Sequence, residues 1–219
     1  MKKNLLSAAV AATSVVVASS AVGQAYINDR LTGEALVYPI YSAQNGNDTY
    51  IHVVNTTGDY KAVKVRMIEG ENSQEVLDFN LYMSPKDHFA FAITADGEGA
   101  KLKTTDNSCT VPIIPSAGTT ADGKTVREVS FRNFLYAKDK DNAGEDREQL
   151  GYVEVIEMGQ IDPKATATVD PKGKTNVAAA IKHGATGVPA DCSIPVAGWS
   201  VISGASGKWL AECGAGCAA

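Results

Sequence analysis

An acidic segment of the chain holds the side chains whose spacing comes closest to a metal-binding loop. Asp139 and Asp141 match positions 1 and 3 of an EF-hand calcium loop. Position 5 is Ala143, however, and position 12 is Leu150, where the loop requires a bidentate glutamate. The pattern therefore predicts a solvated loop between two strands. Asp139, Asp141 and Asp146 stay candidates for a calcium site of another type, because hard oxygen ligands are dense there.

Four cysteines, Cys109, Cys192, Cys213 and Cys217, allow three disulfide pairings. A bond between Cys109 and Cys192 would join a loop-like region to the segment that follows a predicted helix. Cys213 and Cys217 would then pair with each other or with partners in a continuation of the chain. Their spacing lacks the CxxC pattern of thiol oxidoreductases, and no histidine is close in sequence. The cysteines therefore predict structural disulfides.

The histidines and nucleophiles show no catalytic spacing. His52, His88 and His183 form none of the HxH, HxxH or HExxH patterns, and we expect His52 and His88 to face solvent on strands. GxSxG, SxxK and phosphate-binding glycine loops are missing from the sequence. Glu154 and Glu157 would lie on opposite faces of a strand, which does not suit shared acid–base chemistry. The sequence predicts no enzyme activity and, apart from calcium, no cofactor.

The first 25 residues have the three-part layout of a secretory signal peptide. Lys2 and Lys3 precede an uncharged stretch from Leu5 to Gly23, and the predicted cleavage site after Ala25 has small residues, Ala25 and Gly23, at the -1 and -3 positions. Cleavage after Gly23 and retention as a membrane anchor are the alternatives. No later stretch is long enough to span a membrane, so we expect an extracytoplasmic product without a transmembrane segment, folded where thiols oxidise.

Composition excludes several classes of partner. The 219 residues include 20 Lys+Arg and 25 Asp+Glu, a net charge of -5. Removing the signal peptide deletes two lysines and no acids, which leaves 18 bases, 25 acids and a net charge of -7. An acidic chain has no electrostatic reason to bind nucleic acid or an anionic membrane surface.

Alternating side chains predict a mainly β fold. In the segment 62–68, Val63, Val65 and Met67 lie on one face, with Lys64 between them on the other, as expected for a half-buried strand. The predicted strands are 35–41, 49–55, 62–68, 75–83, 88–93, 126–136 and 151–158. Polar turns separate the first five, and we expect a loop over 96–124. This organisation is typical of an antiparallel, immunoglobulin-like β-sandwich.

The domain boundaries follow from composition. We expect a signal peptide at 1–25, the sandwich at 26–159, and a different segment at 160–219. That last segment should contain a linker, a short helix ending near His183, and an irregular Gly/Ala-rich part with three of the cysteines. It stops without a recognisable end to any element, so we expect the sequence to be the front portion of a longer protein.

Several segments resemble uncharacterised secreted or cell-surface proteins of Gram-negative bacteria. They are 36–41, 47–57, 62–66, 75–81, Ser84-Pro85, 151–159 and Pro189-x-Asp191-Cys192. The resemblance covers about residues 34–200, and such proteins generally continue beyond this length. It implies no established activity, so no functional residues are carried over.

Together these features predict an exported, non-enzymatic structural or adhesion-type protein, with protein or envelope partners of unknown identity. We expect it in the periplasm, at the cell surface or in the medium of a Gram-negative bacterium. The alternative is a periplasmic ligand- or calcium-binding protein, and a hydrolase ranks third.

Overall fold

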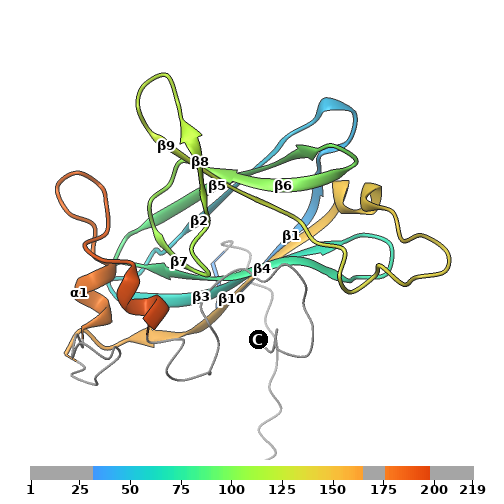
Figure 1. Ribbon diagram of the computed structural model, residues 1–219. Coiled ribbons are helices and arrows are strands. Elements are labelled where there is room, and N and C mark those ends of the chain that lie inside the picture. The colour runs from blue at the N-terminus through green and yellow to red at the C-terminus, as the bar shows by residue number, and fades with distance from the viewer. Residues whose placement is uncertain (1–31, 165–175, 198–219) are drawn as a thin grey trace, which may run out of the picture. The chain divides into compact units, whose positions relative to one another are not determined.

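The computed structural model describes residues 32–164 and 176–197. The predicted signal peptide, most of the predicted linker, Cys213 and Cys217 lie outside these ranges. The described chain forms ten β-strands and a few short helices (Figure 1). The strands are β1 (Ala35–Ser42), β2 (Thr49–Val54), β3 (Tyr60–Glu69), β4 (Glu75–Met83), β5 (His88–Asp96), β6 (Gly99–Thr104), β7 (Cys109–Val111), β8 (Ser116–Thr119), β9 (Thr125–Ser130) and β10 (Leu150–Ile161).

The strands form two antiparallel sheets, with the orders β1-β10-β3-β4-β7 and β2-β5-β6-β9-β8. Figure 1 shows the two sheets facing each other as two layers. Hydrophobic side chains from both inner faces fill the space between them, among them Val65, Phe79, Phe89, Leu102 and Val153. The predicted β-sandwich class is therefore confirmed. Burial of this shared apolar layer is the main force that holds the sheets together.

The outer faces carry the charges that alternate with the core residues. On the first sheet, Arg66 donates hydrogen bonds to Glu75 (2.6 Å) and Glu154 (3.0 Å) on the neighbouring strands. On the second sheet, Lys101 pairs with Asp96 (3.5 Å) and Glu128 (3.0 Å). These cross-strand ion pairs are partly exposed, so each contributes little to stability. Together with the inward apolar residues, they specify which face of each strand is exposed to solvent.

The region 96–124, predicted as a loop, contains β6, β7 and β8. In β6 the buried Ala100 and Leu102 alternate with Lys101 and Lys103. Strand β7 has only three residues, and β8 is fully exposed. The predicted strand 126–136 was too long, because β9 ends at Ser130. Leu135, which lies in the predicted strand but beyond β9, is 48% exposed.

Helix α1 (Val177–Ile181) confirms the short helix predicted after the linker. Asn176 caps it, because the Asn176 side-chain oxygen accepts the backbone N–H of Ala179 at 2.9 Å. The side chain of Ile181 is fully buried. A further helical segment covers 193–197. Burial of the apolar side of α1, more than the intrinsic helix propensity of its residues, stabilises this short helix.

Candidate functional site

The turn between β4 and β5 gathers polar side chains from three parts of the chain. Ser84, Pro85, Lys86 and Asp87 form this turn, in which the Asp87 N–H donates to the Ser84 carbonyl at 3.1 Å. Proline suits the second position of such a turn, and Lys86 at the third position has a φ of 60°. The Asp87 carboxylate also accepts the Ser84 N–H at 2.9 Å. The turn thus holds the Ser84 and Asp87 side chains together.

Asn55 ties this turn to the loop that follows β2. Its buried side-chain amide donates to the carbonyls of Ser84 (2.8 Å) and Asp59 (2.7 Å). The Asn55 oxygen accepts the backbone N–H and the hydroxyl of Thr57. If either the β4–β5 turn or the loop after β2 moved, the buried Asn55 amide would lose hydrogen bonds.

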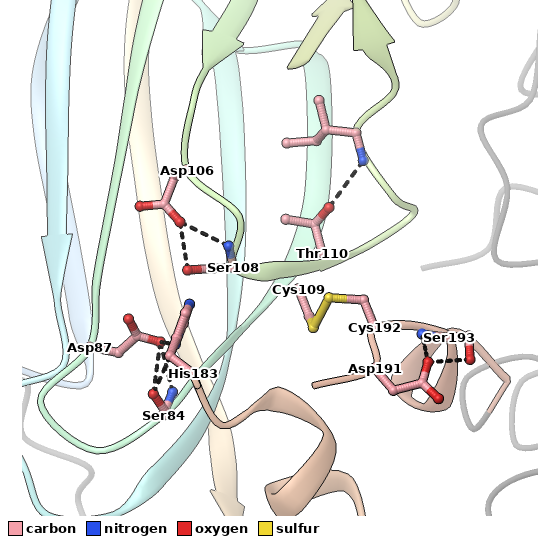
Figure 2. The surroundings of a disulfide bond; sticks show 11 residues. Ser84, Asp87, Asp106, Ser108, Cys109, Thr110, His183, Asp191, Cys192 and Ser193 are labelled. Carbon is pink, nitrogen blue, oxygen red and sulfur yellow. Dashed lines mark hydrogen bonds and ion pairs between the residues drawn. A yellow bond between two sulfur atoms is a disulfide. The ribbon is translucent and has the colours of Figure 1, made fainter. Parts of the chain in front are cut away.

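His183, from the segment after α1, contacts the turn (Figure 2). The His183 Nδ1 atom lies 3.2 Å from Ser84 Oγ and 3.3 Å from Asp87 Oδ2. A serine hydrolase uses one ring nitrogen for the serine and the other for the acid. Here serine and acid meet the same nitrogen, so this trio does not have the geometry of a catalytic triad. It instead fastens the α1 segment to the sandwich.

The disulfide between Cys109 and Cys192 lies beside this cluster (Figure 2). It joins β7 to the start of the 193–197 helical segment across 83 residues of sequence. Asp191 Oδ1 accepts the Ser193 N–H at 3.0 Å, and the Asp191 N–H donates to the Ala180 carbonyl at 2.9 Å. Of the three pairings that the four cysteines allow, the structure forms the one that includes Cys109–Cys192, which confirms a structural disulfide. Cys213 and Cys217 lie outside the described residues.

His52 and His88 come together on the outer face of the second sheet. His52 Nδ1 lies 3.0 Å from His88 Nε2, and both side chains are exposed, as predicted. Sequence reasoning missed their contact, because it depends on the register in which β2 pairs with β5. The available signal was that both residues alternate with inward apolar residues, which places both on an outer face.

A second polar cluster is buried at the other end of β4, next to the turn that joins β3 to β4. The guanidinium of Arg147 bonds Glu69 through Nε (3.1 Å) and Nη2 (3.0 Å), and both side chains are almost fully buried. Arg147 Nη1 also donates to Asp139 (2.9 Å) and to the Asn142 carbonyl (2.6 Å). The Arg147 guanidinium lies 4.3 Å from the centre of the Tyr136 ring. This network attaches the loop between β9 and β10 to the sheet.

Two neighbouring glutamates have pKa values shifted in opposite directions. Burial favours a raised pKa for Glu69, but hydrogen bonds from Arg147 and from the backbone of the β3–β4 turn outweigh it and lower that pKa. Burial dominates at Glu148 and raises its pKa, against a 2.6 Å hydrogen bond from the Tyr136 hydroxyl. Both carboxylates are engaged in packing the loop, and neither shift by itself indicates chemistry.

The three calcium candidates belong to the same loop. Asp139 is bound by Arg147 and by the Asn72 side-chain amide at 3.0 Å. Among residues 32–164 and 176–197, no group of three or more His, Cys, Asp or Glu side chains is arranged to hold a metal ion. Calcium binding at Asp139, Asp141 and Asp146 stays a prediction. A calcium-induced rise in melting temperature that Asp141→Ala abolishes is its test.

Comparison with known proteins found no matching family model, no similar curated protein and no similar solved structure. No helix in the described ranges has the length and apolar character of a membrane span.

Proposed function

We propose that this chain is an exported, non-enzymatic structural or adhesion-type module of the bacterial cell envelope or surface. The immunoglobulin-like character expected from the sequence belongs to this proposal. The observation that carries it is the Cys109–Cys192 disulfide, which braces a β-sandwich against the segment that follows it. Such a bond persists in oxidising compartments and is rare in the cytoplasm. The signal-peptide pattern at 1–25 supports the same compartment.

Two features of the structure support a structural role. The Ser84–His183–Asp87 trio is arranged to fasten one segment to another, with the acid and the serine on the same ring nitrogen. Large apolar side chains are also exposed on β1 and β2, including Ile40 (64%) and Tyr50 (71%). Exposed aromatic and aliphatic groups are typical of surfaces that contact other macromolecules.

Fractionation combined with thiol labelling tests export. The chain is expressed in a Gram-negative host in a Cys213→Ser/Cys217→Ser background, so that only Cys109 and Cys192 report. We expect the full chain outside the cytoplasm, with both thiols unreactive to a maleimide until a reductant is added. The matched control lacks residues 2–25 and should stay cytoplasmic with reactive thiols. A full chain that stays in the cytoplasm in reduced form would contradict the proposal.

The non-enzymatic part has a separate test. The purified chain and its Ser84→Ala variant are assayed in parallel with chromogenic ester substrates. We expect both proteins to hydrolyse the ester no faster than buffer does. Turnover that disappears in Ser84→Ala would show that the trio is a hydrolytic site and would overturn this part of the proposal.

A further inference from the structure

The His52–His88 pair has the geometry of two neighbouring ligands of one metal ion. In the pairing of β2 with β5, His52 lies opposite Ala90 and His88 lies opposite Val54, which makes the histidines diagonal neighbours on one face. Their ring centres are 5.2 Å apart with an interplanar angle of 31°. Two ladder positions of an antiparallel sheet therefore hold the imidazoles in register before any ligand arrives.

The distance between the two nitrogens is compatible with two ligands of one metal ion. His52 Nδ1 and His88 Nε2 are 3.0 Å apart. With metal–nitrogen bonds of about 2.0–2.1 Å, this separation corresponds to an N–metal–N angle of roughly 91–97°. Tetrahedral coordination needs about 109°, or a separation of about 3.3–3.4 Å. The pair is thus closer to adjacent corners of a square, the arrangement that Cu²⁺ prefers.

The backbone on each side of the pair is fixed by hydrogen bonds. The Tyr38 hydroxyl donates to the His52 carbonyl at 2.6 Å, and the His88 N–H donates to Asp87 Oδ1 at 2.8 Å. The Asp87 carboxylate already accepts the Ser84 N–H and contacts His183, so the two imidazoles are the ligands available to a metal ion. Imidazole nitrogens suit copper, and both rings are exposed to solvent.

We propose that His52 and His88 form a surface site for Cu²⁺, with water in the remaining equatorial positions. Copper would take the place of the hydrogen bond that now links the two rings. Zn²⁺ should bind more weakly, because the spacing favours right angles and because Cu²⁺ leads the affinity order of the first-row divalent metals. The site is independent of export and of the structural role proposed above.

Titration of the purified, disulfide-bonded chain with CuCl₂ in a non-chelating buffer tests the proposal. The variants His52→Gln and His88→Gln each remove one ligand, and His183→Gln is the matched control that removes the third histidine. We expect one Cu²⁺ per chain, with an affinity that falls about tenfold or more in either ligand variant, or about 1.4 kcal/mol. The control should bind as the unmodified chain does.

Electron paramagnetic resonance provides a second readout that a change in folding does not imitate. We expect nitrogen hyperfine splitting from two imidazoles in the unmodified chain and from one in each ligand variant. Circular dichroism should show the same fold in the unmodified chain and in the two ligand variants, because His52 and His88 are exposed. Equal copper affinity in the unmodified chain and the His52→Gln/His88→Gln double variant would overturn the proposal. So would an equal loss in His183→Gln.

Discussion

Breaking the Cys109–Cys192 disulfide is expected to lower the free energy of unfolding by about 4.5 kcal/mol. The two cysteines are 83 residues apart. For a closed loop of that size, the chain-entropy relation gives about 15 cal/mol/K of entropy that the unfolded chain regains when the bond is broken. At about 25 °C this equals about 4.5 kcal/mol, or a melting temperature lower by about 9–18 °C for a chain of this length.

Urea unfolding followed by circular dichroism measures this loss. Cys109→Ala, Cys192→Ser and the double variant break the same bond, so their losses should be nearly equal and should not add. Adding a reductant to the unmodified chain is the matched comparison and should reproduce the loss. In a Cys213→Ser/Cys217→Ser background, the same reductant should leave the double variant unchanged. A double variant as stable as the oxidised chain would refute the reasoning, because the cross-link would then not restrict the unfolded state.

Four further substitutions probe the packing of the sandwich. Arg147→Met leaves the buried Glu69 carboxylate without its cation and should cost about 3–5 kcal/mol in urea unfolding, and a loss below about 1 kcal/mol would contradict the buried ion pair. The raised pKa of Glu148 means that its contribution to stability is present at acidic pH and is lost as pH rises through the folded-state pKa. Glu148→Gln should therefore gain stability relative to the unmodified chain as pH rises above about 4. Glu69 has a lowered pKa, so its contribution is present above about pH 4 and is lost as pH falls, and the stability deficit of Glu69→Gln in thermal melts should shrink on the acidic side of that pH. Gly151→Ala should cost about 1–3 kcal/mol or more, because a methyl group there overlaps a backbone carbonyl of β3, and an unchanged melting temperature would contradict that close approach.

The sequence predicted the strands with strong apolar alternation and missed β6, β7 and β8, in which large apolar side chains are few or absent. The segment 62–68 became part of β3 because its valines and Met67 alternate with charges over a full strand. Strand β8 (Ser116–Thr119) has no buried side chain, so it carries no hydrophobic pattern at all. Strand β7 is too short to show a period of two. Its place in the sheet is set by pairing with β4, which is a tertiary contact.

The candidate sites depended even more on tertiary contacts. The sequence predicted structural disulfides, but it allowed three pairings of the four cysteines, and only the fold shows that Cys109 bonds Cys192. The contact of His52 with His88 required the register of two strands separated by β3 and β4. The burial of Arg147 could not be read from a charged stretch, where a solvated side chain is the ordinary outcome. Only the fold brings Glu69 opposite it.

The disulfide also decides how the molecule would carry a mechanical load. Strands β8, β9 and β10 all belong to the stretch of chain between Cys109 and Cys192. Tension applied to the chain on either side of this stretch therefore passes directly from β7 to Cys192 through the sulfur atoms. While the bond is oxidised, about 270–300 Å of extended polypeptide stays shielded from stretching, and reduction would release that length.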